Sequence, residues 1–183
     1  SNSQNRTPPL PQSPNNEWPK AWYLAYGEYN NPKHTNKKIP NEPVPASAMR
    51  SLGISYWKID PSPYTYPALS IPWDPKDAVD PRLVKLREER NYIYADIITI
   101  AKDVLPHYEE KIKDFFEEHI HDDEEIRYIL DGSGFFDVRD VNDEWVRVHV
   151  KKGDLFAFPA GIYHRFTLDE GESIHAMRLF KGH

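Results

Sequence analysis

The sequence predicts a mainly β protein, a sandwich or small barrel of antiparallel strands, with several peripheral helices in its N-terminal half. After residue 119, short runs of β-branched and aromatic residues alternate with turns that contain Gly, Asp or Asn, which is typical of antiparallel sheets. Before that residue, longer amphipathic patterns broken by proline indicate helices. The expected C-terminal strands are 125–130, 135–140, 145–150, 155–159, 163–168 and 173–180, with a turn at 131–134 between the first two.

The N-terminal half predicts two strands that complete the barrel and helices that pack outside it. Two runs are rich enough in aromatic and β-branched residues to be strands. Pro81 is favourable at the start of a helix, because its missing N–H is not needed there, and Pro106 must separate two helical stretches. The expected strands are 21–26 and 54–60, and the expected helices are 81–92, 96–105 and 107–119.

We expect one domain, residues 21–183, with two peripheral segments. Residues 1–20 are rich in Pro, Asn and Ser and too polar to bury themselves, which indicates a flexible extension. Six prolines between residues 61 and 81 exclude a long helix or a central strand, because each proline lacks an N–H and fixes φ. The segment 61–81 is therefore expected to be an insertion on the surface.

Composition excludes several classes of protein and of metal site. The 183 residues carry a net charge of −6, which removes the long-range attraction to phosphate that nucleic-acid binders use. No apolar stretch approaches the roughly 18 residues of a membrane helix. With no cysteine, any metal must be held by imidazole and carboxylate. We expect a monomer that binds neither nucleic acid nor membrane. It is expected in the cytoplasm, with the nucleus as a second compartment, since residues 1–20 lack the pattern of a secretory signal.

Two histidines precede a run of carboxylates in the stretch EEHIHDDEEIRYIL. In an extended chain alternate side chains share one face, so His119 and His121 can present imidazole nitrogens to one point. Glu125 follows an acidic turn and completes a two-histidine, one-carboxylate set of the kind that holds non-haem iron. The simpler alternative is a solvated acidic turn that happens to contain two imidazoles.

A further candidate ligand lies in GDLFAFPAGIYHRFTL. Gly153, Pro159, Gly161 and His164 fit the pattern G-x(5)-P-x-G-x(2)-H, in which Gly153 permits a tight turn and the Pro and Gly re-aim His164 inward. Alone, His164 would more often be a packed strand histidine. Combined with the first motif, it gives three imidazoles and one carboxylate, which would leave two positions of an octahedral metal for water or a bidentate substrate.

These two motifs resemble those of the cupin superfamily. The first cupin motif, H-x-H-x(3)-E-x(6)-G, is met by His119, His121, Glu125 and Gly132, and the second is met through His164. The resemblance implies a cupin-type double-stranded β-helix, a small antiparallel barrel, that holds one metal ion.

A closer resemblance is to the acireductone dioxygenase family, through RNYIYADIITI, LPHYEEKIKDFFEEHIHDDEEIRYILDGSGFFDVRD, FPAGIYHRFTLDE and AMRLF. Lys113 and Leu168 depart from the cupin pattern, where glycine and asparagine are usual. The family resemblance implies one Fe(II) or Ni(II) ion per chain and cleavage by O2 of an acireductone, a small enediol with a methylthio tail, in methionine salvage. With Fe(II) the implied products are formate and the keto-acid precursor of methionine. With Ni(II) they are formate, carbon monoxide and methylthiopropionate.

The resemblance and strand parity together suggest residues that act on the substrate. Arg127 shares the strand face of Glu125, and Arg178 in AMRLF matches the second active-site arginine of the family, so both are candidate catalytic residues that stabilise negative charge. Phe115, Ile129 and Phe166 are candidates for an apolar lining that receives the methylthio tail. Without the resemblance, the arginines would be ordinary surface residues and the apolar side chains ordinary core.

Three functions stay open from the sequence. The first is the acireductone dioxygenase. The second is another cupin oxygenase or a metal-dependent isomerase, which the same ligands could support. The third is a cupin metal-binding module with a regulatory or protein-interaction role and weak or no catalysis. The two arginines favour an enzyme, because a binding module has no evident need for charged groups beside the metal.

Overall fold

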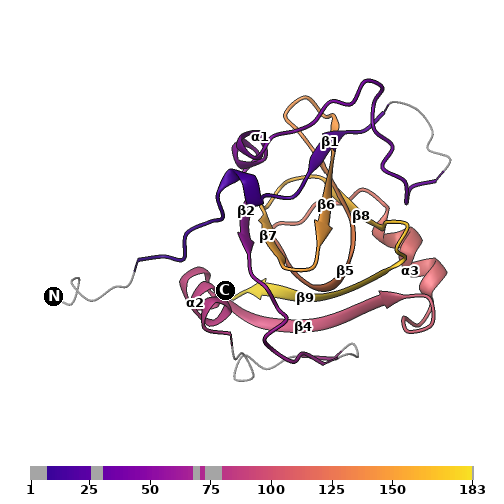
Figure 1. Cartoon of the computed structure of the whole chain (residues 1–183). Helices are drawn as coiled ribbons and strands as arrows, with labels where there is room; N and C mark the ends of the chain where they lie inside the picture. The colour runs from indigo at the N-terminus through magenta and orange to yellow at the C-terminus, as the bar shows by residue number, and fades with distance from the viewer. Residues whose placement is uncertain (1–7, 26–30, 68–70, 73–79, 183) are drawn as a thin grey trace.

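Strand β5 (Glu125–Arg139) organises the fold, because it belongs to both halves of a curled, nine-stranded antiparallel sheet. Its first residues pair with β7 (Asp154–Phe158) and β9 (Ser173–Lys181). Its last residues pair with β6 (Trp145–Lys151) and β8 (His164–Leu168). The strands therefore wrap around a common interior (Figure 1).

Strands that precede β5 extend this sheet, and two of them lie within the strands predicted at 21–26 and 54–60, whereas the other two were not predicted. β1 (Ala21–Tyr23) pairs with β6, and β2 (Ser55–Lys58) pairs with β7. At the other edge, β4 (Tyr92–Ala101) pairs with β9, and the short β3 (Ile71–Pro72) pairs with β4. The predicted mainly β class is confirmed. The structure is a computed structural model that describes residues 8–25, 31–67, 71–72 and 80–182.

β5 does not turn at residues 131–134, so the turn predicted there was wrong. The strand bends instead: Gly132 has a φ of 74°, and the register with β9 shifts between Ile129 and Asp131. A Cβ on Gly132 would lie 2.2 Å from the carbonyl oxygen of Ser173, so only glycine allows the two strands to approach this closely. The bulge carries β5 from one half of the sheet to the other.

The helix predicted for residues 96–105 was also wrong. Most of this segment is strand β4, which pairs with β9 along its whole length, and turns follow from residue 102. Ile97, Ile98, Thr99 and Ile100 are β-branched, and such side chains pack well on a pleated sheet. The segment forms a strand because it pairs with β9, which lies more than 70 residues further along the chain. The local sequence pattern does not reveal that partner.

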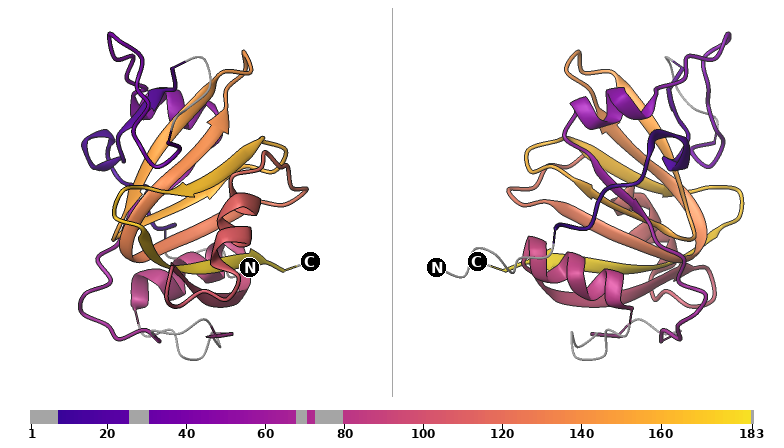
Figure 2. Two further views of the ribbon diagram at one scale, coloured as in Figure 1. Left: turned by 90° about the vertical axis from the view of Figure 1, so that its right-hand side faces the viewer. Right: turned by 60° about the vertical axis from the view of Figure 1, so that its left-hand side comes forward.

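The helices lie outside the barrel, and two of them occur where the sequence predicted helices. In α2 (Pro81–Arg90), Pro81 occupies the first turn, the Asp80 side chain accepts from the N–H of Arg82 at 2.9 Å, and Asn91 ends the helix in the left-handed conformation. Figure 2 shows α2 against the outer face of β4 and β9. The helices are the 3₁₀ turn η1 (Asn15–Glu17), α1 (Ala46–Ser51), α2 (Pro81–Arg90) and α3 (Tyr108–Phe115).

Apolar side chains form two cores on opposite faces of the sheet. Burying each such side chain contributes about 1.5 to 3 kcal/mol. The outer core, between the sheet and α2, contains Leu83, Leu86, Ile97, Tyr128, Met177 and Leu179. The inner core fills the barrel and contains Phe136, Val138, Val148, Phe156, Phe158 and Leu168.

The extension expected at residues 1–20 is partly folded onto the barrel. Trp18 is buried in the inner core, the Ser13 N–H donates to the carbonyl of Tyr56 at 3.1 Å, and the Leu10 N–H donates to the Glu89 carboxylate at 3.0 Å. Residues 8–20 therefore belong with the domain, contrary to the expected boundary, because one tryptophan buries enough apolar area to anchor a polar segment. Residues 1–7, and 68–70 and 73–79 of the expected insertion, lie outside the described residues.

Candidate metal centre

Three histidines meet because two segments that are far apart in the sequence form one short bridge. The His119 N–H donates to the carbonyl of His164 at 2.9 Å, and the His164 N–H donates back at 3.0 Å. The Gly161 N–H donates to the carbonyl of His121 at 2.9 Å. One ring nitrogen from each of the three histidines lies within 4.8 Å of the other two. The expected convergence occurs, but only His164 belongs to a regular strand, β8, and it meets His119 through an isolated bridge.

Backbone carbonyls fix how two of the imidazoles point. Nδ1 of His119 lies 2.8 Å from the carbonyl oxygen of Glu117, and Nδ1 of His164 lies 3.1 Å from that of Ile162. A carbonyl only accepts, so each Nδ1 carries the proton and each Nε2 offers a lone pair. Burial lowers the pKa of His164, which keeps its ring neutral at pH 7.

The surroundings of Nε2 of His164 test whether a metal fits this site. This atom is buried and has no hydrogen-bond partner among the described residues. An unsatisfied buried acceptor costs about 1 to 3 kcal/mol unless something binds it. The Glu125 carboxylate lies close by, with Oε2 at 3.8 Å from Nε2 of His164 and 3.6 Å from Nε2 of His121. Three neutral imidazoles and one carboxylate are a donor set that suits a divalent transition metal.

Two arginines stand beside this cluster, each with its own carboxylate. Arg127 forms an ion pair with Glu125. Arg178 binds Asp96 with two hydrogen bonds, from Nε to Oδ1 at 2.7 Å and from Nη2 to Oδ2 at 2.5 Å. Burial lowers the pKa of Arg127, whereas the neighbouring Glu125 carboxylate opposes that shift. Guanidinium groups remain charged at pH 7 despite such shifts.

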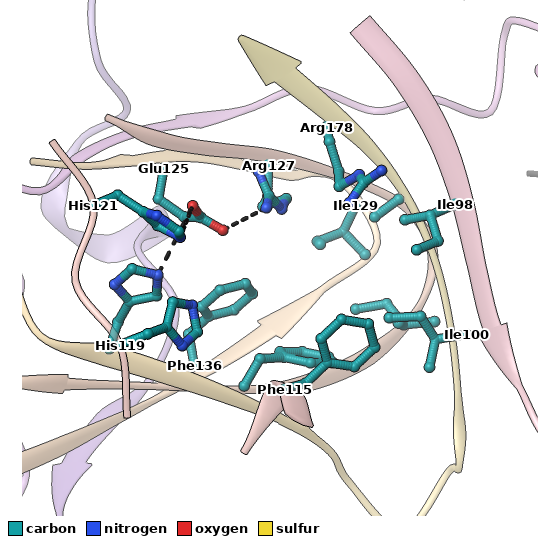
Figure 3. A pocket seen from close by; sticks show the side chains of 14 residues that line it. Ile98, Ile100, Phe115, His119, His121, Glu125, Arg127, Ile129, Phe136 and Arg178 are labelled. Carbon is teal, nitrogen blue, oxygen red and sulfur yellow. Dashed lines mark ion pairs between the residues drawn. The ribbon is translucent and has the colours of Figure 1, made fainter. Parts of the chain in front are cut away.

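All nine residues singled out from the sequence line one cavity of about 220 Å³. Figure 3 shows its two ends: imidazoles, Glu125 and Arg127 at one, Ile98, Ile100 and Phe115 at the other. The structure thus places the candidate residues together, whereas their individual roles stay predictions. The nine residues are Phe115, His119, His121, Glu125, Arg127, Ile129, His164, Phe166 and Arg178.

Sequence reasoning missed five side chains that line the same cavity. Two of them lie on β4, whose strand character was not predicted. Ile174 and Ala176 could have been found from strand parity, because alternate residues of β9 face inward with Arg178. Phe136 lies an odd number of positions from Ile129, and it faces inward because the bulge after Ile129 shifts the alternation along β5. The missed residues are Ile98, Ile100, Phe136, Ile174 and Ala176.

The acidic turn that leads into Glu125 is anchored to the protein. Glu124 accepts a hydrogen bond from the Tyr92 hydroxyl at 2.7 Å and lies 3.2 Å from Nη2 of Arg90. Arg90 in turn donates to the Tyr92 hydroxyl at 2.6 Å. The turn is therefore not simply solvated. Its fixed end holds Glu125 at the start of β5.

Fold and site together define a class of protein. A curled antiparallel barrel carries three imidazoles, one carboxylate and two arginines at one end of an otherwise apolar interior cavity. This is a cupin-type barrel with a site suited to a metal ion and a small anionic molecule. No helix in the described part of the chain is long and apolar enough to cross a membrane.

Comparisons with known proteins identify the family. The model of the ARD/ARD′ family matches residues 68–183. Acireductone dioxygenase from Macaca mulatta is 52% identical over 165 residues, which cover 89% of this chain and 83% of the relative. The human acireductone dioxygenase gives the same identity and coverage. The chain belongs to the ARD/ARD′ family and is an enzyme, a dioxygenase of the oxidoreductase class.

A solved structure agrees with this fold. It is described as acireductone dioxygenase from Bacillus anthracis with a cadmium ion in the active centre, and it aligns with a TM-score of 0.65 over 90% of this chain and 94% of its own. At 21% identity the match shows the barrel fold. Of the three functions left open by the sequence, the comparisons support the dioxygenase.

Proposed function

We propose that this chain cleaves an acireductone with O2 in methionine salvage, using one divalent ion held by His119, His121, Glu125 and His164. The observation that carries the proposal is the buried, unpartnered Nε2 of His164, which faces a carboxylate and two further imidazoles at the polar end of the cavity. The family's curated relatives carry the name of this activity.

The proposed ligands fit Fe(II) or Ni(II), since neither ion requires thiolate and both accept imidazole with carboxylate. A divalent ion in this site would act as a Lewis acid that lowers the pKa of an enediol bound to it. Nδ1 hydrogen bonds from His119 and His164 to the backbone keep these rings oriented before any ion binds. The protein therefore contributes by holding the donor atoms in position before the ion binds.

The arginines are proposed to bind and stabilise the anionic form of the substrate. An enediolate has two adjacent oxygens, and Arg127 and Arg178 offer N–H donors on neighbouring strands beside the ligand cluster. Their charges would also stabilise the negative charge that develops as O2 is reduced. Because the cavity wall excludes much of the water, these interactions are stronger than on an exposed surface.

The apolar end of the cavity is proposed to receive the methylthio tail. Phe115 and Phe166 meet edge to face with ring centroids 6.3 Å apart, and Ile129 faces them from β5. An apolar tail there would be held by dispersion and area burial, without a specific polar contact. The tail would thus set the orientation of the enediol relative to the polar end.

Which products form is proposed to depend on the ion. With Fe(II) we expect formate and the keto-acid precursor of methionine. With Ni(II) we expect formate, carbon monoxide and methylthiopropionate. The cytoplasm, with the nucleus as a second compartment, remains the predicted location.

The test is to strip the protein of metal, reload it with Fe(II) or Ni(II), add the acireductone and measure oxygen uptake and products. Glu125→Gln should lower both bound metal and turnover by at least about 100-fold, because a carboxylate ligand is lost. Glu172→Gln is the matched control, since this exposed carboxylate pairs with Lys33 and does not line the cavity.

Two results would count against the proposal. One is an absence of oxygen uptake by wild-type protein loaded with either ion. The other is a Glu125→Gln variant that retains full metal occupancy and turnover, which would remove this carboxylate from the ligand set.

A further inference from the structure

A row of charges crosses three neighbouring strands along the wall of the cavity. Asp96 on β4 is the register partner of Arg178 on β9, and Arg178 is in turn the register partner of Arg127 on β5. The two arginines are therefore direct cross-strand neighbours. Like charges in this arrangement repel, so each guanidinium needs a carboxylate to hold it in place.

The two carboxylates are not equivalent. Glu125, the partner of Arg127, also faces the imidazoles of His121 and His164. Within the described part of the chain, Asp96 has no such second contact, and it does not line the cavity. All the side-chain hydrogen bonds of Asp96 within the described residues come from Arg178.

The ion pair between Asp96 and Arg178 orients the guanidinium of Arg178 more than it stabilises the fold. Arg178 and Asp96 keep 34% and 28% of their side-chain surface exposed, and ion pairs of that exposure contribute little to folding. Two parallel hydrogen bonds, however, define the plane of the guanidinium. They use Nε and Nη2, which leaves the N–H groups of Nη1 for a ligand.

We infer that Asp96 is a positioning residue: it draws Arg178 away from Arg127 and turns Nη1 of Arg178 toward an anion bound in the cavity. The inference rests on the proposed function, because it assigns Asp96 a part in binding the enediolate. Asp96 acts through Arg178 and does not itself touch the substrate.

Whether Asp96→Asn weakens or tightens the binding of the anionic substrate distinguishes a positioning role from a simple contribution of charge. Glu125, Asp96, Arg127 and Arg178 together carry no net charge, so Asp96→Asn leaves one excess positive charge beside the substrate. If Asp96 only set the local charge, its loss would tighten the binding of an anion. If Asp96 positions Arg178, its loss frees the guanidinium to swing, and binding weakens.

The experiment compares wild type, Asp96→Asn, Arg178→Gln, the double variant and the control Glu172→Gln. Steady-state oxygen uptake gives KM and kcat, and anaerobic titration with the acireductone, followed by the absorbance of the enediolate, gives the dissociation constant. Asp96→Asn should raise both KM and the dissociation constant about tenfold, the size expected when one charge-assisted hydrogen bond is lost. The change in kcat should stay within about threefold, since binding is the step affected.

The double variant decides how Asp96 acts. Asp96→Asn should have no further effect in the Arg178→Gln background, because its target is gone. An unchanged or lowered KM for Asp96→Asn in the active enzyme would overturn the inference, and so would a full additional effect in the double variant. A wild-type protein that neither binds nor oxidises the acireductone would instead refute the proposed function. Unaltered melting of every variant, checked by circular dichroism, establishes that each is folded.

Discussion

Strand β5 carries two interior carboxylates with opposite surroundings. Asp137, near its end, accepts from Nε and Nη2 of Arg147 at 2.7 and 2.8 Å and from Nε of Arg165 at 2.9 Å. Nη1 of Arg147 donates to the backbone carbonyls of Pro32 and His34. Glu125, at its start, meets one arginine and two imidazoles around a cavity, and one of those imidazoles keeps an unpartnered nitrogen.

The difference distinguishes a structural charge cluster from a functional one. Asp137 and Arg147 are fully buried, and their charges are compensated by each other and by the backbone. The cluster at Glu125 is not completed by the protein's own atoms, because Nε2 of His164 has no hydrogen-bond partner among the described residues. Folding normally satisfies buried polar groups. Nη2 of Arg165, beside Asp137, also lacks a hydrogen-bond partner among the described residues, but its guanidinium lies over the rings of Phe116 and Trp145. Nε2 of His164 instead lies at a cavity beside a carboxylate and two further imidazoles, which indicates a place for a ligand.

Asp137→Asn should give the largest effect and act on stability. The substitution preserves shape but leaves the buried guanidinium of Arg147 and the partly buried one of Arg165 without their anion, which should cost about 4 kcal/mol of unfolding free energy. Urea unfolding of the metal-free protein measures this loss. Asp143→Asn is the control, since it removes one exposed charge in a turn where asparagine tolerates the positive φ of 58°, and its effect should stay within about 0.5 kcal/mol. Equal stability of the two variants would contradict the structural role of Asp137.

His164→Ala should show the opposite pattern. Removing this ring deletes a proposed ligand, so metal occupancy and oxygen uptake should fall by at least about 100-fold. The unfolding free energy of the metal-free protein should fall by only about 1 to 2 kcal/mol, less than for Asp137→Asn. The buried ring gives up its packing and the hydrogen bond from Nδ1 to the Ile162 carbonyl, but Nε2 has no partner to lose. Elemental analysis and urea unfolding measure the two quantities.

His34→Ala provides the comparison for this variant, since the ring of His34 is half exposed and pairs with Glu170 outside the cavity. It should retain metal and activity. If His164→Ala keeps its metal, or if it loses stability as Asp137→Asn does, the distinction between the open and the closed cluster fails.

Gly132→Ala should weaken the bend that separates the two clusters. A Cβ there meets the Ser173 carbonyl, in addition to the strain of a positive φ, and the expected loss is about 2 to 3 kcal/mol. Gly161→Ala separates the two causes, because Gly161 has a similar φ of 79° but no neighbouring atom of the described residues within 4 Å of the position that a Cβ would take. Its loss should be about 1 kcal/mol by urea unfolding. Equal losses would show that close strand approach at Gly132 is unimportant.

The open cluster was predictable from the sequence to a large extent. Spacing alone brought His119, His121 and Glu125 together as candidates, because all three lie within seven residues, and alternation along the strand placed Arg127 and Ile129 beside them. His164 followed from a second motif. These are local patterns, in which backbone geometry fixes the direction of neighbouring side chains.

What the sequence did not predict depends on distant pairing. Asp96 and Ile98 were assigned to a helix, since a short apolar run fits either period, and only the pairing with β9 shows that they are in a strand. The bend at Gly132 was predicted as a turn for the same reason. Asp and Gly are common both in turns between strands and in bulges within a strand, and the close approach of Ser173 shows that this is a bulge. The partners of Asp137 likewise come from β6, β8 and the N-terminal loop.

A third cluster, around Asp169, lies on the same half of the barrel as Asp137. Its substitution should have the smallest effect on stability, and that effect should depend on pH. Asp169 accepts from Nε2 of His149 at 2.9 Å, from the Ser133 hydroxyl at 2.5 Å and from the Gly171 N–H at 2.9 Å. Burial alone would raise the pKa of Asp169, but these hydrogen bonds outweigh it and hold that pKa below its ordinary value. Like Asp137, this carboxylate is completed by the protein itself.

A carboxyl group whose pKa is lower in the folded state stabilises the protein above its unfolded pKa, near 4, and this contribution is lost as the pH falls through the folded value. Asp169→Asn should therefore be less stable than wild type by about 1 kcal/mol at pH 6. The difference between the two proteins should shrink as the pH falls below about 4, because wild-type Asp169 then becomes protonated and neutral. Urea midpoints at pH 6, 4 and 3 follow this difference. A gap that stays constant or widens on acidification would mean that the ionised carboxylate of Asp169 is not what the cluster stabilises, and the cluster would then no longer belong with Asp137 as a closed, charge-compensated site.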